Sequence, residues 1–381
     1  MAQNLLFGIG EPVFVREMQD NIPAEKTIAI MKALGVKCLR EWTYLTTVLK
    51  DPKTVDEVAA KRQQEIYRMA EDAGMTVVGM SHMWFLPDPV RKGGCSVPDR
   101  DLTEGSLYMR FLSMLEESWY TMAGRFPEVK YWEMGNEWNH NPFLHPLTYG
   151  ESGLADVFDM QTKADISTDM MYWSAKGIKR ANPYAKTVMA SPAPVDEKGK
   201  PSVKAMAGYL EMIYKNIFSG AYPTKDTDDF FDVLAWHPYY FSNDPGDYAW
   251  TPLGPDERWV AENDEIYGVA RKYGDGDKKV MFTELGYTDL GSPEADKKQG
   301  EWYESIFRIC AERMPYVQTV HLFRLFEDFR ADRERKSADW GGIAEVYFGM
   351  FREPENGFSP KEKALAYKRA AGGTGDLHAF I

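Results

Sequence analysis

The chain alternates along its whole length between short apolar segments typical of β-strands and longer segments with helical periodicity. Eight segments predict strands, at residues 4–10, 36–44, 75–84, 129–138, 185–193, 230–240, 279–288 and 317–326. Eight predict helices, at residues 23–34, 54–72, 102–125, 161–180, 202–218, 255–272, 293–314 and 360–371. Strands separated by helices pair in parallel through right-handed crossovers. Eight such units in 381 residues predict a (β/α)8 TIM barrel as a single domain over residues 1–381, with an open doubly wound sheet as the alternative.

Some of the segments that connect a strand to the next helix are long. They follow the third, fourth, sixth and eighth strands, at residues 85–101, 139–160, 241–254 and 327–359. In a barrel these loops lie together on the face at the C-terminal ends of the strands, where barrel active sites form. We therefore expect the functional site on that face.

Charge and composition exclude several classes of partner. The formal net charge of −13 argues against nucleic acid and against docking on anionic lipid. No apolar run reaches the length of a membrane-spanning helix, and Cys38, Cys95 and Cys310 form no disulfide framework or zinc motif. The N-terminal residues lack the features of a signal peptide, so we expect a cytoplasmic protein, or a secreted one whose signal peptide has been removed. The sequence gives no indication of oligomeric state.

Polar side chains stand where the predicted strands end. They are Arg40, His82, Asn136, Glu137, His237, Tyr239, Glu284 and Arg324. Because apolar residues suffice for a buried parallel strand, these polar ends indicate a site. Two glutamates on non-adjacent strands fit glycoside hydrolysis, which needs a proton donor and a carboxylate at the anomeric centre. One carboxyl group must have a raised pKa and the other must be ionised, and we expect Arg40 and Tyr239 to keep Glu284 ionised.

The order and spacing of these motifs resemble those of the clan A glycoside hydrolases. Gly-Asn-Glu-Trp at 135–138 resembles the clan's Asn-Glu pair at the end of strand four. Phe-Thr-Glu-Leu-Gly at 282–286 resembles the nucleophile segment of strand seven. His-Pro-Tyr at 237–239 is similar to the His-x-Tyr of strand six, and Tyr-Phe-Gly-Met-Phe at 347–351, followed by a Pro-Lys helix, is similar to the ending of several member families. The resemblance spans nearly the whole chain and implies a barrel enzyme with Glu137 as acid/base and Glu284 as nucleophile.

This resemblance also implies a mechanism without a cofactor or metal. The enzyme would retain anomeric configuration by double displacement through a glycosyl-enzyme, with its two carboxyl groups about 5–5.5 Å apart. Asn136 would hold the sugar 2-hydroxyl, while Arg40, His237 and Tyr239 would position or polarise Glu284. Two departures leave the sugar open: Trp138 stands where a proline is common, and the run Phe-Arg-Leu-Phe at 323–326 replaces a tryptophan of strand eight.

The expected substrate is an oligo- or polysaccharide. A β-glucan or β-mannan is the first expectation, and an exo-acting glycosidase such as an arabinofuranosidase or β-xylosidase is the alternative. His82 and Arg324 are candidate substrate contacts. Four tryptophans on or near the long loops are candidate stacking platforms for sugar rings or, equally, loop-packing residues; they are Trp84, Trp138, Trp250 and Trp340.

Other interpretations remain open on sequence alone. The barrel could bind carbohydrate without cleaving it, or be a metal-dependent hydrolase or isomerase. Against a metal, no two of the four central histidines have a spacing typical of metal ligands; they are His82, His140, His237 and His321. The two candidate glutamates could instead be structural ion-pair partners. Glu133, on the same strand face as Glu137, is expected to be a buried structural partner of Arg40.

Overall fold

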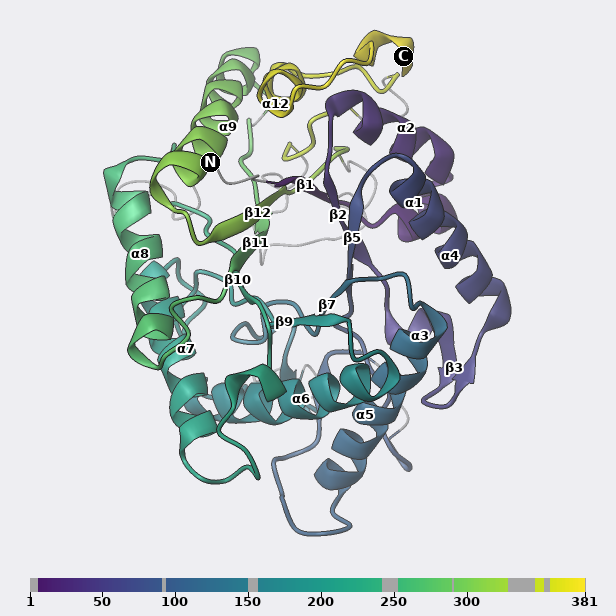
Figure 1. Cartoon of the computed structure of the whole chain (residues 1–381), viewed down its shortest axis with the longest axis vertical. Coiled ribbons are helices and arrows are strands. Elements are labelled where there is room, and N and C mark those ends of the chain that lie inside the picture. Colours follow the sequence, from purple (N-terminus) through teal and green to yellow (C-terminus); the bar gives the residue numbers. More distant parts are fainter. Residues whose placement is uncertain are drawn as a thin grey trace.

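Eight parallel strands form one sheet that curls into a barrel (Figure 1). A computed structural model describes residues 6–90, 94–149, 157–241, 253–289, 291–327, 347–352 and 357–380. The strands, in spatial order, are β10 (Leu234–Trp236), β11 (Val280–Leu285), β12 (Val317–Leu322), β1 (Leu6–Gly10), β2 (Cys38–Trp42), β5 (Thr76–Met80), β7 (Tyr131–Glu133) and β9 (Lys186–Val188). A parallel bridge between Val188 and Val233 joins the two outermost strands, so the barrel is nearly closed. This confirms the predicted barrel over an open sheet; the single-domain expectation stays a prediction.

Helices surround the ring of strands (Figure 1). The eight predicted helices are all present, as α2 (Ala24–Leu34), α4 (Glu57–Asp72), α5 (Leu107–Arg125), α6 (Met160–Ala181), α7 (Val203–Phe218), α8 (Glu257–Lys272), α9 (Pro293–Arg313) and α12 (Glu362–Ala371). Most begin at a residue whose side-chain oxygen accepts a backbone N–H of the first turn; these are Asp56, Ser106, Asp159, Ser202, Asp256 and Ser292. No helix in the described part of the chain is both long and apolar enough to cross a membrane.

Several short elements were not predicted. They are α1 (Val13–Asp20), α3 (Leu45–Val48), the pair β3 (Leu49–Asp51) and β4 (Thr54–Val55), the pair β6 (Ser96–Val97) and β8 (His145–Pro146), η1 (Thr227–Asp229) and η3 (Leu377–Phe380). The predicted helix over 54–72 therefore begins later than expected, because Thr54 and Val55 pair with β3 and Asp56 caps the helix. The β6–β8 pair joins the loops that follow β5 and β7, which places these two loops side by side above the barrel.

The barrel interior has an apolar layer below a polar one. A small cluster of buried residues fills the lower layer: Cys38, Val78, Val188, Val233, Ala235 and Met281. Side chains two residues apart share a strand face, so Arg40 lies on the inner face above Cys38 and Thr283 above Met281. The strands thus carry polar groups inside the barrel at the end where the long loops begin.

Close packing between the strands and the surrounding helices depends on Gly79. This residue of β5 pairs with Trp132 of β7, whose ring packs against Trp119 of α5 at 5.7 Å between centroids. A Cβ atom at Gly79 would lie 2.4 Å from the Trp132 ring, so the ring must move to accept a side chain.

We expect Gly79→Ala to destabilise the protein by about 1–3 kcal/mol, because overpacking displaces the Trp132 ring. The matched control is Gly208→Ala in α7, where nothing lies within 4 Å of the new methyl group. It should leave stability unchanged or raise it slightly, because alanine favours helix. Urea unfolding followed by circular dichroism measures both, and equal stabilities for the two variants would contradict this packing.

Candidate active site

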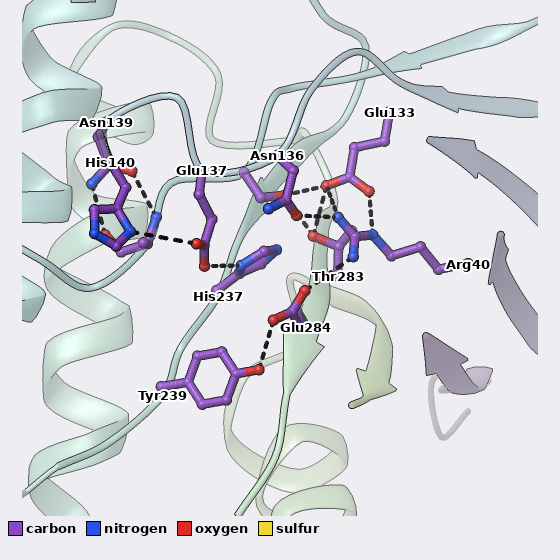
Figure 2. Close-up of polar contacts among 12 residues, drawn as sticks. Arg40, Glu133, Asn136, Glu137, Asn139, His140, His237, Tyr239, Thr283 and Glu284 are labelled. Carbon is purple, nitrogen blue, oxygen red and sulfur yellow. Dashed lines mark hydrogen bonds and ion pairs between the residues drawn. The ribbon is translucent and has the colours of Figure 1, made fainter. Parts of the chain in front are cut away.

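A buried ion pair lies at the centre of the polar layer (Figure 2). Arg40 donates to both carboxylate oxygens of Glu133, from Nε at 2.5 Å and from Nη2 at 3.2 Å. Ser191 and Thr283 each donate a hydroxyl to Oε1 of Glu133, at 2.6 and 2.9 Å. The carboxylate of Glu133 is therefore fully engaged in the barrel, which confirms the expectation that it is a structural partner of Arg40.

Arg40 also contacts two of the candidate site residues. Its Nη2 donates to Oδ1 of Asn136 at 2.7 Å, and its Nη1 donates to Oε2 of Glu284 at 3.2 Å. The hydroxyl of Tyr239 donates to the other oxygen, Oε1 of Glu284, at 2.8 Å. Glu284, near the end of β11, thus has a donor on each oxygen (Figure 2). The structure brings these four residues together as the sequence predicted.

Glu137 lies in the loop after β7, and its carboxyl group lies close to that of Glu284. Its backbone has a φ of 50°, in the left-handed region, and its N–H donates to the carbonyl of Ser191 at 2.7 Å. Nδ1 of His237 lies 2.8 Å from Oε1 of Glu137, and Nδ1 of His140 lies 3.8 Å from Oε2. An imidazole therefore stands beside each oxygen of this carboxyl group (Figure 2).

The two glutamates are close together. One donor atom each from Glu137, His237 and Glu284 lies within 4.8 Å of the others. Glycosidases that retain configuration place their carboxyl groups about 5–5.5 Å apart, whereas inverting enzymes need about 6.5–9.5 Å. The short separation fits the retaining arrangement.

The same three donors are also close enough to hold a divalent cation. The Arg40 guanidinium on Glu284 opposes this with a positive charge. Nor do the four central histidines converge: Nε2 of His321 lies 3.2 Å from Sγ of Cys38 in the lower barrel. We therefore assign no metal to the site.

The local environment lowers the pKa of Glu137. Burial raises it, but the imidazoles of His140 and His237 outweigh burial and bring the pKa to about 2. Nε2 of His237 is buried without a hydrogen-bond partner among the described residues. An orphaned acceptor is tolerated better than an orphaned N–H, which favours hydrogen on Nδ1 donating to ionised Glu137. Glu137 is thus ionised when the site is empty.

The pKa of Glu284 is shifted in the opposite direction. Burial raises it most, and the negative charge of Glu137 adds to the increase, while His237 and Arg40 lower it only in part. Arg40 is shared: besides Glu284 it contacts Glu133 and Asn136, and its shortest contact, of 2.5 Å, goes to Glu133. That Arg40 and Tyr239 keep Glu284 ionised stays a prediction. The pKa order in the empty site is therefore the reverse of the one the reaction needs.

His82 and Arg324 lie in the same part of the barrel. Burial, with the charge of Arg40 as a smaller cause, lowers the pKa of His82 to about 3, so its imidazole is neutral. Its ring packs against Tyr44 at 4.8 Å and Phe143 at 5.5 Å between centroids, and its Nδ1 is buried without a hydrogen-bond partner among the described residues. Arg324 follows β12 and is 4% exposed, with its guanidinium over the Phe323 ring.

Of the four tryptophans considered as sugar platforms, two are core residues. Trp84 and Trp138 are 2% and 1% exposed, and their rings meet edge to face at 6.0 Å. Nε1 of Trp84 donates to the carbonyl of Ser96. The Trp138 ring packs so closely against Gly135 that a Cβ atom added there would lie 2.1 Å from the ring. Their faces are covered, so the structure corrects the platform interpretation in favour of packing. Trp250 and Trp340 lie outside the described residues.

Other aromatic residues border the site instead. Trp42 and Phe323 have nearly parallel rings, 17° apart with centroids 6.4 Å apart, and Tyr44 is next to Trp42 at 30° and 6.5 Å. Phe348 contacts both Phe323 and Tyr239. Trp42 and Tyr44 follow Arg40 at intervals of two residues, a spacing that could have identified them from the sequence.

Comparisons with known proteins support the fold. No protein-family model matches the chain, and no curated protein matches it in sequence. A family 39 glycoside hydrolase from the gut symbiont Bacteroides cellulosilyticus has a TM-score of 0.61 and 16% identity, over 97% of this chain and 64% of that one. The present chain therefore spans less than two thirds of that enzyme.

Two further solved structures match over nearly their full length. A broad-specificity endoglucanase of glycoside hydrolase family 5 from Clostridium acetobutylicum has a TM-score of 0.61 and 12% identity, over 97% of both chains. A hyperthermophilic β-glucosidase from Pyrococcus furiosus has a TM-score of 0.64 and 12% identity, over 100% of this chain and 98% of that one. At these identities the similarity shows that the chain shares the barrel fold of these enzymes.

We expect Glu133→Gln to destabilise the protein by about 3–5 kcal/mol, because it removes the main counter-charge of the buried Arg40 and leaves only the 3.2 Å contact with Glu284. The matched control is Glu304→Gln, which removes one partner of an exposed pair with Arg369 and should change stability little. Chemical unfolding of both variants tests this expectation. A small effect of Glu133→Gln, similar to that of the control, would show that Arg40 does not depend on Glu133.

Proposed function

We propose that this protein is a retaining glycoside hydrolase, with Glu284 as nucleophile and Glu137 as acid/base. The observation that carries the proposal is the pair of glutamates from β11 and from the loop after β7, with carboxylate oxygens within 4.8 Å of each other. Each carboxyl group has its own set of partners, Arg40 and Tyr239 for Glu284 and the two imidazoles for Glu137. A structural ion pair needs opposite charges, which two glutamates do not supply.

The first step forms a glycosyl-enzyme. An oxygen of Glu284 attacks the anomeric carbon, the bond to the leaving oxygen breaks, and Glu137 gives its proton to that oxygen. Asn136, held by Arg40 at 2.7 Å, is placed to bind the 2-hydroxyl of the sugar. His82 offers a neutral imidazole for another hydroxyl.

The second step returns the enzyme to its starting state. Glu137, now ionised, takes a proton from water while the water oxygen attacks the anomeric carbon. The ester bond to Glu284 breaks, and its carboxylate is recovered between Arg40 and Tyr239. The donors on both oxygens stabilise this leaving carboxylate.

The proton belongs to the pair of carboxyl groups rather than to either one. In the empty site it favours Glu284, and the reaction needs it on Glu137. A sugar with developing positive charge at its anomeric carbon stabilises ionised Glu284, which moves the proton toward Glu137. Binding of the substrate thus produces the protonation state that the reaction needs.

The substrate we propose is a β-linked glycan of the glucan or mannan type. Trp42, Tyr44 and Phe323 present a row of rings beside the carboxyl groups, and aromatic rings stack on the apolar faces of sugars. The names endoglucanase and β-glucosidase among the similar structures favour a β-glycan.

A panel of aryl β-glycosides and β-glycans tests the function. We expect wild type to hydrolyse at least one, and Glu284→Ala to lose the activity and regain turnover with azide, giving the α-glycosyl azide of inverted configuration. Glu137→Ala should slow poor leaving groups by about 10²–10⁴-fold, because acid assistance is lost. Glu304→Ala, an exposed glutamate, is the control. Full activity without Glu284 would refute the mechanism, and glycan binding without hydrolysis would favour a binding module.

Removal of metal ions separates this mechanism from a metal-dependent one. Because Arg40 opposes a cation at Glu284, we expect prolonged dialysis against EDTA to leave the glycosidase activity unchanged. Zinc or manganese added afterwards should not increase it. Loss of activity on chelation, with recovery on adding a metal, would assign the Glu137–His237–Glu284 donors to a metal instead.

A further inference from the structure

The carboxyl group of Glu137 stands between two imidazoles that come from different parts of the chain. His237 follows β10 and lies on Oε1 at 2.8 Å. His140 comes from the loop of Glu137 itself and lies 3.8 Å from Oε2. The proposed mechanism uses His237 as a hydrogen-bond partner and leaves His140 without a role.

The backbone around His140 is held firmly in place. The N–H of His140 donates to the carbonyl of Glu137 at 2.8 Å, so the chain folds back toward the carboxyl group. The side chain of Asn139 exchanges two hydrogen bonds of 2.8 Å with the backbone of Ala193. Nζ of Lys163 donates to the carbonyl of Asn139 at 3.2 Å and thereby ties this turn to α6. The turn that carries His140 is thus held by three separate segments.

Several ionisable groups surround this imidazole. Glu137 is the nearest carboxylate, with His237 on its far side, and His82 shares the Phe143 ring with His140. Lys163 comes from α6, and burial lowers its pKa to about 8. The loop after β9 approaches through Gly199, in the turn that carries Asp196, Glu197, Lys198 and Lys200. Glu197 acts on Lys163, and Nδ1 of His140 lies 3.8 Å from Oε2 of Glu137.

The two oxygens of Glu137 are not equivalent. Oε1 is engaged by His237, so Oε2 is the oxygen free to carry a proton toward the leaving oxygen. The separation of 3.8 Å to His140 is longer than a hydrogen bond, but such contacts shorten when a substrate completes the site. We propose that His140 is a positioning residue for the acid/base: it fixes Oε2 of Glu137 and helps set the pH at which Glu137 loses its proton. This inference rests on the proposed function.

The electrostatics of the site agree with this geometry. The imidazoles of His140 and His237 both lower the pKa of Glu137. A partner that favours the ionised carboxylate keeps its pKa low. Removal of the imidazole must therefore raise the pKa of Glu137. In the complex with substrate, where Glu137 carries the proton, the alkaline limb of the pH profile of kcat must move to higher pH.

The test compares His140→Phe, which keeps a ring and removes both nitrogens, with His140→Gln, which restores a donor. We expect His140→Phe to move the alkaline limb of kcat up by about one pH unit. It should slow a phenyl glycoside about tenfold and leave a dinitrophenyl glycoside, whose departure needs no acid, unchanged. His140→Gln should recover part of both effects. His145→Phe, a histidine of the same loop bonded to Ser96, should show neither effect.

A direct titration of Glu137 by 13C NMR on labelled protein separates this inference from the proposed function. An inert wild type in which His140→Phe still raises the pKa of Glu137 would refute the glycosidase function and keep the electrostatic role of His140. An active wild type whose pH profile, leaving-group dependence and Glu137 titration are unchanged in His140→Phe would overturn the inference. Circular dichroism of each variant shows whether it is folded.

Discussion

The buried pair of Arg40 and Glu133 is the interaction on which the rest of the site depends. Charges in a barrel interior lose the solvation of water, and such a pair is tolerated only when its remaining donors and acceptors are satisfied. Glu133 meets this condition through hydroxyls of Ser191 and Thr283. One carboxylate therefore connects β2, β7, β11 and the end of β9 at the level where the apolar layer stops.

The same pair determines what Arg40 can do for the reacting groups. A guanidinium has five N–H donors, and the four hydrogen bonds from Arg40 go to Glu133, Asn136 and Glu284. Most of its charge is neutralised by Glu133, so Arg40 orients Glu284 without fully suppressing its pKa. A positively charged group that is already paired can hold a nucleophile in place and still allow the protonation state of the nucleophile to change when the substrate binds.

Those parts of the molecule that follow from local periodicity could be predicted from the sequence. The eight strands and eight helices repeat patterns of two and 3.6 residues, and Glu137 and Glu284 stand where polar groups interrupt such patterns. Helix α1 could not be found in this way, because its first N–H groups are satisfied by Glu41 of β2, far away in sequence. For Trp84 and Trp138 the sequence left sugar stacking and packing equally open for the same reason: contacts between loops, which no local pattern records, cover their rings.

The two proposed catalytic carboxyl groups are positioned by different means. Glu284 belongs to a strand, so the barrel itself fixes it, whereas β7 ends at Glu133 and Glu137 lies in the loop beyond. The left-handed backbone of Glu137 is unfavourable for a residue with a side chain and must be maintained by its surroundings. The contacts of this loop with Ser191 and Ala193 do so, because both belong to the segment that follows β9. The geometry of the acid/base therefore depends on two neighbouring loops that hold each other, and that of the nucleophile depends on the barrel and on the Tyr239 hydroxyl.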